Sequence, residues 1–208
     1  MSLVYKKVVS EGALLGLWKI SESLEELYAT VNLSGPDQKI LSKKGSERKK
    51  TEWLAVRRLL RCMLNATAEI TYDAHGKPFL KDSNYYLSIS HSVQYAAVYL
   101  NKVKPVGIDI QIIKSDIEKG IDFFLNAEEQ LWVDTTDFML LNILWSAKES
   151  IYKFAGVHDL DPKNQISVHP FKADSIGIIT AVFTDKINET LSSIHYEVFE
   201  DYVLTRTL

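Results

Sequence analysis

The order of predicted elements repeats once along the 208 residues, and this repeat restricts the folds that the chain can adopt. The first half gives a strand at 14–20, a helix after Ser21 or Ser23, a break at 35–36, a long helix opened by Ser46 that carries Trp53, and three strand-like runs at 78–80, 85–90 and 95–100. The second half gives a strand at 105–113, helical runs at 121–124 and 127–133, a long helix at 138–154 before Gly156, and three strands at 166–171, 177–183 and 195–208.

This repeated order predicts an α+β fold made of two similar subdomains, residues 1–103 and 104–208, related by a pseudo-two-fold axis. We expect each subdomain to be a small, mainly antiparallel sheet with a long helix packed on it. A cleft between two such halves is a usual place for a ligand, so we expect the ligand site there.

Composition excludes several protein classes. Cys62 is the only cysteine, which rules out a disulfide scaffold and fits a reducing compartment. With 46% hydrophobic and 25% charged residues, the chain is not disordered. No apolar run reaches the roughly 18 residues of a membrane span, and charges and glycines interrupt the first 20 residues, unlike a signal peptide. We therefore expect a cytoplasmic protein without membrane contact.

Positive charge is concentrated in one segment. Residues 39–61 contain nine basic and two acidic residues, a net charge of +7, whereas the rest of the chain has a net charge of −10. This contrast favours a localised anion site, although a solvated helix face would have the same composition. In the long helix of this segment we expect Arg57, Arg58 and Arg61 on or beside the polar flank. Because the chain is acidic and has no nucleic-acid motif, we expect no nucleic-acid partner.

The strand at 105–113 contains an acid within a β-branched run. Alternation places Asp109 and Gln111 on one face, and Gly107 allows another backbone to approach closely. A carboxylate in such surroundings is costly unless it is paired or bound to a metal, and both alternatives remain open at this point.

The helix at 138–154 carries Trp145, Glu149 and Lys153 at four-residue steps, so these side chains share one face. An exposed salt bridge between Glu149 and Lys153 would explain the spacing, but Trp145 on the same face indicates partial burial.

Two polar segments of the first half contain side chains that could bind an anion. The run Ser88-Ile89-Ser90-His91-Ser92 ends a strand with hydroxyls around a histidine, and Gly76-Lys77-Pro78 forms a turn. A solvent-exposed strand end and a plain hairpin turn are the alternatives.

In this order, the segments GKP (76–78), SISHS (88–92), VGIDIQ (106–111) and WSAKESIYK (145–153) resemble the 4′-phosphopantetheinyl transferase superfamily, in particular its surfactin-type, two-subdomain branch. The signatures of that family are a (V/I)G(I/V)D strand and a W(S/C)xKE(S/A)xxK helix about 40 residues apart. Asp109 and Glu149 are 40 residues apart, and every defined position of the helix signature is matched.

The resemblance implies an enzyme that transfers the 4′-phosphopantetheine arm of coenzyme A to a serine of an acyl or peptidyl carrier protein and releases adenosine 3′,5′-bisphosphate. It implies that Asp109 and Glu149 bind Mg²⁺ at the CoA pyrophosphate, that Glu149 accepts the proton of the carrier serine, and that Lys153 contacts the phosphate under attack. On this basis we expect the two acids to meet across the seam between the halves.

The resemblance also implies residues for the rest of CoA. Ser90 and His91 would hold its 3′-phosphate, and Lys77 would lie near the adenine. From the basic segment, we expect Lys44 and Arg48 to supply further phosphate contacts.

The chain departs from the family pattern at Gln111, where many members have glutamate. An amide oxygen can still bind Mg²⁺ but adds no charge, so Gln111 is a candidate third ligand, and a catalytically weak CoA- or carrier-binding module is the alternative function. We expect a monomer, because one chain supplies both halves of the site. As a wall for the carrier we expect residues 116–133, with Phe123, Phe124 and Leu125.

Overall fold

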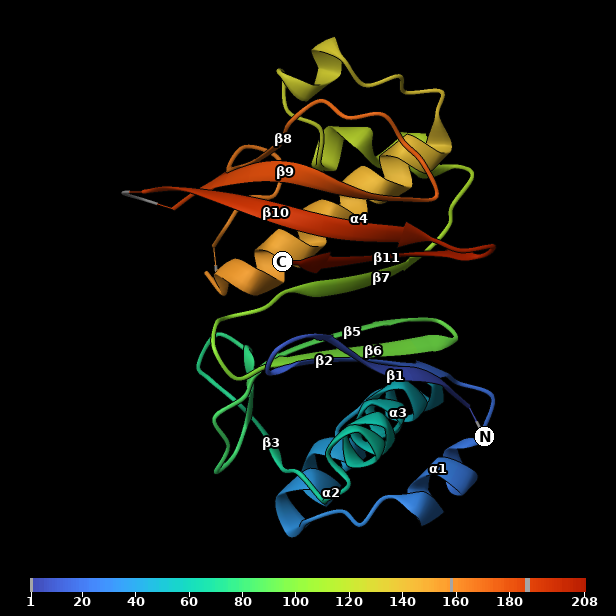
Figure 1. Cartoon of the computed structure of the whole chain (residues 1–208). Helices are drawn as coiled ribbons and strands as arrows, with labels where there is room; N and C mark the ends of the chain where they lie inside the picture. The colour runs from blue at the N-terminus through green and yellow to red at the C-terminus, as the bar shows by residue number, and fades with distance from the viewer. Residues whose placement is uncertain (1, 158, 186–187) are drawn as a thin grey trace. The chain divides into compact units, whose positions relative to one another are not determined.

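The computed structural model describes residues 2–157, 159–185 and 188–208, and the chain divides into two compact units, Met1–Pro105 and Val106–Leu208 (Figure 1). Each unit combines an antiparallel sheet with one long helix, so the predicted α+β fold with two subdomains is confirmed. The pseudo-two-fold relation and the cleft between the units stay predictions.

The N-terminal unit is a four-stranded antiparallel sheet, in the order β1-β2-β6-β5, with α3 packed against β2 and β6 (Figure 1). A small hairpin of β3 and β4 precedes β5. The elements are β1 (Leu3–Ser10), β2 (Ala13–Lys19), α1 (Leu24–Thr30), α2 (Gly35–Ser42), α3 (Glu47–Leu64), β3 (Ile70–Tyr72), β4 (Pro78–Leu80), β5 (Tyr86–Ser92) and β6 (Tyr95–Asn101).

Serine side chains begin all three helices of this unit. Ser23 forms a capping box with Glu26, and Ser34 and Ser46 accept hydrogen bonds from backbone N–H groups in the first turns of α2 and α3. The predicted break at 35–36 is wrong, because proline is tolerated in the first turn of a helix and Ser34 caps α2 directly before it.

Arg57 of α3 is not on the polar flank where the sequence predicted it. Its side chain is buried, its Nη2 atom lies 2.8 Å from Oδ1 of Asp37, and its guanidinium lies 3.1 Å from the centre of the Trp53 ring. The helix α2, which the sequence did not predict, supplies the acid that makes this burial tolerable.

The C-terminal unit is a five-stranded antiparallel sheet, in the order β7-β11-β10-β9-β8, with α4 lying across one face (Figure 1). The helical runs predicted at 121–124 and 127–133 are two 3₁₀ helices, of which the first begins earlier than predicted and the second is shorter. The last predicted strand is a hairpin, β10 and β11. The elements are β7 (Ile108–Ile112), η1 (Ile117–Phe123), η2 (Glu129–Leu131), α4 (Phe138–Ala155), β8 (Ile166–Val168), β9 (Ile176–Thr184), β10 (Glu189–Val198) and β11 (Tyr202–Thr207).

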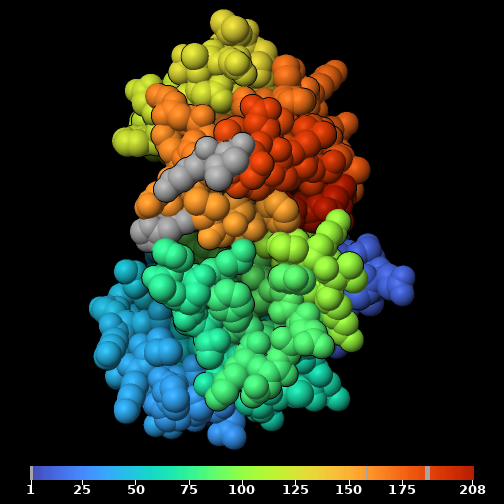
Figure 2. Space-filling view, turned by 90° about the vertical axis from the view of Figure 1, so that its left-hand side faces the viewer, coloured from blue at the N-terminus to red at the C-terminus, as the bar shows by residue number. Residues whose placement is uncertain are grey.

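Apolar residues of α4 and the inner face of this sheet form one core, which includes Leu144, Ile151, Ile179 and Val203. The helix ends at Gly156, whose φ of 63° is the left-handed conformation of a helix C-cap. The chain between β7 and α4 carries η1 and η2, and it lies at the surface of this unit in yellow-green and yellow (Figure 2).

Among the helices within the described ranges, none has the length and hydropathy needed to span a bilayer.

Close packing between β7 and α4 depends on Gly107. A Cβ atom at this position would overlap the carbonyl oxygen of Ser150 and would lie 2.8 Å from Cβ of Phe154, so a side chain forces the helix off the strand. The sequence prediction of a close backbone approach at Gly107 is therefore confirmed.

We expect Gly107→Ala to lower the free energy of unfolding by about 1–3 kcal/mol, the usual cost of overpacking a core. Gly120→Ala is the matched control, because a Cβ atom there meets nothing within 4 Å. Chemical denaturation of both variants measures the difference. Equal stability of the two variants would show that α4 and β7 can separate without cost.

Candidate active site

Asp109 is buried on β7 and both of its carboxylate oxygens are hydrogen-bonded to α4. Its Oδ1 atom accepts a hydrogen bond from Nζ of Lys153 at 2.7 Å, and its Oδ2 atom accepts one from Oγ of Ser146 at 2.9 Å. The acid is therefore paired, which was one of the two alternatives that the sequence left open. The two donors are seven residues apart, so one face of α4 holds the carboxylate from both sides.

Ser146 also belongs to a hydrogen-bonded network of buried hydroxyl groups. Oγ1 of Thr205 on β11 lies 3.0 Å from Oγ of Ser146 and 2.6 Å from Oγ of Ser150, and it donates a hydrogen bond to the carbonyl oxygen of Ser146 at 2.8 Å. Thr205 is also the register partner of Asp109 in the sheet. Sequence analysis missed Thr205, and the strand alternation in residues 202–207 is the signal that could have placed it on this face.

Glu149 is half-buried on the same face of α4, in the field of two other charges. Burial raises the pKa of Glu149, the negative charge of Asp109 adds to this rise, and the ammonium of Lys153 opposes it. The charges of Asp109 and Lys153 therefore both act on the Glu149 carboxylate. Both acids belong to the unit Val106–Leu208, so the expectation that they meet across the seam between the halves is wrong.

Gln111 is buried two residues after Asp109, and its Nε2 atom donates a hydrogen bond to the carbonyl oxygen of Ile112 at 2.7 Å. The amide NH₂ group is therefore directed to the backbone. Gln111 also borders a pocket of about 400 Å³ within the C-terminal unit. The other lining residues are Lys114, Asp116, Ile117, Gly120, Phe123, Phe124 and Trp145.

The donor set at this place consists of two carboxylates and one neutral amide. Mg²⁺ usually takes one or two protein carboxylates and completes its coordination with water and substrate phosphate, so Asp109, Glu149 and Gln111 fit such an ion by their chemistry. No group of three or more His, Cys, Asp or Glu side chains suited to a metal occurs among the residues described. The two negative charges placed within each other's field are the feature that a divalent cation would offset.

In the N-terminal unit, the structure brings together two of the predicted CoA residues through a third residue. Glu52 of α3 is buried, with its Oε1 atom 3.3 Å from Nε of Arg48 and its Oε2 atom 3.3 Å from Nδ1 of His91. Sequence analysis missed Glu52, which lies one helical turn after Arg48 and has no motif of its own. Its carboxylate lies between the exposed guanidinium of Arg48 and the exposed imidazole of His91.

The other predicted CoA residues of this unit occupy separate elements. Lys44 lies after α2 with its ammonium 6.0 Å from the centre of the Trp53 ring, and Ser90 is buried on β5. Lys77 follows a turn in which the carboxylate of Asp73 accepts hydrogen bonds from the backbone N–H groups of Lys77 and His75. Burial lowers the pKa of both Lys44 and Lys77.

Residues 105–207, from β7 to the end of β11, match the model of the 4'-phosphopantetheinyl transferase superfamily. Through this segment the chain belongs to the 4'-phosphopantetheinyl transferase superfamily. The matched segment contains Asp109, Glu149 and Lys153 together with all of α4. A comparison with curated proteins found no match.

We expect Lys153→Met to destabilise this transferase domain by about 2–3 kcal/mol, because it leaves the buried Asp109 carboxylate without its cation. Lys153→Arg is the control, since a guanidinium retains the charge. Thermal or chemical unfolding measures both variants. If Lys153→Met is as stable as Lys153→Arg, the ion pair contributes nothing to holding α4 on β7.

Proposed function

We propose that the chain transfers the 4′-phosphopantetheine arm of coenzyme A to a serine of an acyl or peptidyl carrier protein, in a Mg²⁺-dependent reaction that releases adenosine 3′,5′-bisphosphate. The observation that carries this proposal is the cluster of Asp109, Glu149 and Lys153 in the segment that matches the superfamily. We also propose that the chain belongs to the surfactin-type branch of the superfamily, that it acts as a monomer, and that it is cytoplasmic.

In this mechanism Asp109 and Glu149 would hold the Mg²⁺ ion, with Gln111 as a neutral oxygen donor. When bound, the ion supplies positive charge to the CoA pyrophosphate, whose leaving half gains negative charge during the transfer. The Ser146 hydroxyl keeps Asp109 oriented, because its hydrogen bond leaves the carboxylate little freedom to turn.

Glu149 accepts the proton of the carrier serine as the serine oxygen attacks the β-phosphorus of CoA. The bond from that phosphorus to the bridging oxygen of the pyrophosphate breaks, and adenosine 3′,5′-bisphosphate leaves. Because burial raises the pKa of Glu149, its carboxylate is a stronger base than an exposed glutamate. The ammonium of Lys153 adds a fixed positive charge beside the phosphate under attack.

Residues of the N-terminal unit bind the rest of CoA in this proposal. Ser90 and His91 contact the 3′-phosphate, Lys77 lies at the adenine end, and Lys44 and Arg48 add phosphate contacts. Glu52 supports this assignment, because it holds Arg48 and His91 together with distances of 3.3 Å to each.

Two exposed apolar side chains within residues 116–133 support a docking place for a carrier protein. Phe123 is 78% exposed and Leu131 is 87% exposed, whereas Phe124 and Leu125 are buried. We call Phe123 and Leu131 the docking surface. Large apolar side chains left in water are a feature of interaction sites, and these two support the predicted wall although Phe124 and Leu125 do not contribute to it.

A catalytically weak CoA- or carrier-binding module is the second candidate. Two observations favour it: Gln111 brings no charge to the metal site, and Asp109 is already satisfied by Lys153 and Ser146. Such a module would bind CoA or a carrier and transfer nothing.

We expect Asp109→Asn and Glu149→Gln each to lower the rate of transfer to an apo carrier about 100-fold or more, because each removes a charge from the reacting centre. Glu200→Gln, at an exposed acid in the turn between β10 and β11, is the control. Transfer is followed by mass spectrometry of the carrier, and circular dichroism checks folding. A variant that transfers at the wild-type rate would contradict the role given to that residue.

We expect His91→Ala to raise the KM for CoA about tenfold while leaving the KM for 3′-dephospho-CoA nearly unchanged, because only CoA carries the phosphate that His91 contacts. His169→Ala, at an exposed position after β8, is the control. Equal effects on both substrates would remove His91 from the 3′-phosphate site without affecting the assignment of Glu149.

A further inference from the structure

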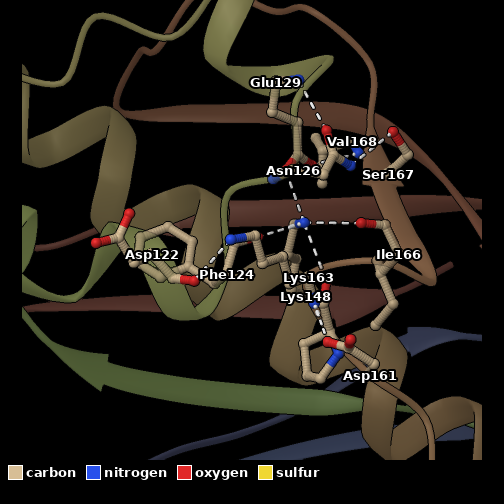
Figure 3. Close-up of polar contacts among 11 residues, drawn as sticks. Asp122, Phe124, Asn126, Glu129, Lys148, Asp161, Lys163, Ile166, Ser167 and Val168 are labelled. Carbon is tan, nitrogen blue, oxygen red and sulfur yellow. Dashed lines mark hydrogen bonds and ion pairs between the residues drawn. The ribbon is translucent and has the colours of Figure 1, made fainter.

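Lys148 is the one charged residue of the segment 145–153 that the proposed mechanism does not use. Its side chain is fully buried, and four oxygen atoms surround its ammonium (Figure 3). Nζ lies 2.7 Å from the carbonyl oxygens of Phe124 and Ile166, 3.0 Å from that of Pro162, and 2.7 Å from Oε2 of Glu129. An ammonium has three protons, so these acceptors engage all of them and leave none for a substrate phosphate.

Glu129 extends this contact to two further parts of the backbone. Its Oε1 atom accepts a hydrogen bond from the N–H of Val168 at 2.8 Å, and its Oε2 atom accepts one from the N–H of Asn126 at 3.0 Å. The Asn126 side chain accepts the N–H of Glu129 at 2.8 Å and donates to Oγ of Ser167 at 3.2 Å (Figure 3). The pair thus joins three parts of the unit, namely the chain around η1 and η2, both ends of β8, and α4.

Lys148 and Glu129 stabilise each other, because neither charge would be stable alone at this buried position. Burial lowers the pKa of Lys148, and the carboxylate of Glu129 opposes that change. Removing one partner of a buried pair leaves an uncompensated charge, which is far more costly than removing both. The segments that the pair joins therefore separate only if both charges are exposed together.

The docking surface lies directly beside these contacts. Phe124, whose carbonyl oxygen binds Lys148, packs its ring 5.3 Å from that of Trp145, while the preceding residue Phe123 faces solvent. Leu131 follows Glu129 by two residues and is also exposed. A shift of the backbone at Phe124 or Glu129 would move one of the two exposed side chains.

We propose that Lys148 and Glu129 are positioning residues that fix the docking surface relative to α4. Lys148 directly precedes the proposed catalytic residue Glu149. The inference rests on the proposed function, because it assigns the docking surface to the carrier. In this inference Lys148, the first lysine of the helix signature, helps to place the carrier protein. Contact with the CoA phosphates is left to other residues.

The test uses the double variant Lys148→Met with Glu129→Gln, which removes both charges and keeps an oxygen at residue 129 for a backbone N–H. We expect the KM for an apo acyl carrier protein to rise about tenfold, with kcat and the KM for CoA changed by no more than about twofold. The matched control is Arg57→Met with Asp37→Asn, which removes a buried ion pair from the N-terminal unit and leaves residues 116–133 intact. This control is expected to keep the carrier KM even where it loses stability.

Hydrogen exchange of the same double variant tests the contacts of Lys148 and Glu129 without any substrate. We expect the amides of Asn126 and Val168, which donate to Glu129, to exchange at least about tenfold faster in the double variant than in the wild type. If the wild type is active but the double variant shows unchanged amide exchange or an unchanged KM for the carrier, this inference is overturned and the proposed function is not. A wild type that transfers nothing would overturn the proposed function and, with it, the assignment of the docking surface. A rise in the KM for CoA instead would show that Lys148 serves the nucleotide.

Discussion

The ion pair between Asp109 and Lys153 requires β7 and α4 to approach closely, and the missing side chain of Gly107 makes room for that approach. An acid in the middle of a buried strand is costly unless a partner reaches it. Here one helix face supplies an ammonium, a hydroxyl and a second acid. The same contact therefore stabilises the fold of the C-terminal unit and gathers the charged groups that the proposed transfer uses.

The helix α4 uses two of its sides for different tasks. Ser146, Glu149 and Lys153 face Asp109, whereas Lys148 points to Glu129 and to three backbone carbonyl groups. Two lysines within one segment thus have unequal surroundings, since Lys153 remains partly exposed and Lys148 does not. A substitution at Lys148 that lowers activity would not by itself show contact with substrate, because the contacts of Lys148 end in the protein.

The sequence predicted the features that follow local rules. Helix periodicity and the caps at Ser46 and Gly156 placed α3 and α4 within a residue or two, and spacing placed Glu149 and Lys153 on one face. Partners far apart in the chain were missed: Thr205 lies 96 residues after Asp109, and only the pairing of β11 with β7 brings them together. Arg57 was misplaced for the same reason, since its burial depends on Asp37 of another helix. The strand β1 was missed because its residues, LVYKKVVS, do not alternate between apolar and polar, and as an edge strand it is nowhere fully buried.

The most direct test of the account is the mass of a purified apo carrier protein after incubation with the wild-type chain and CoA, with Mg²⁺ present or removed by a chelator. We predict a gain of roughly 340 Da, the mass of one phosphopantetheine arm on a serine, with Mg²⁺ and no gain without it. A gain of equal size in the chelator would contradict the metal role of Asp109 and Glu149. An unchanged mass with Mg²⁺ across fatty-acid, polyketide and peptide carriers would contradict transfer itself.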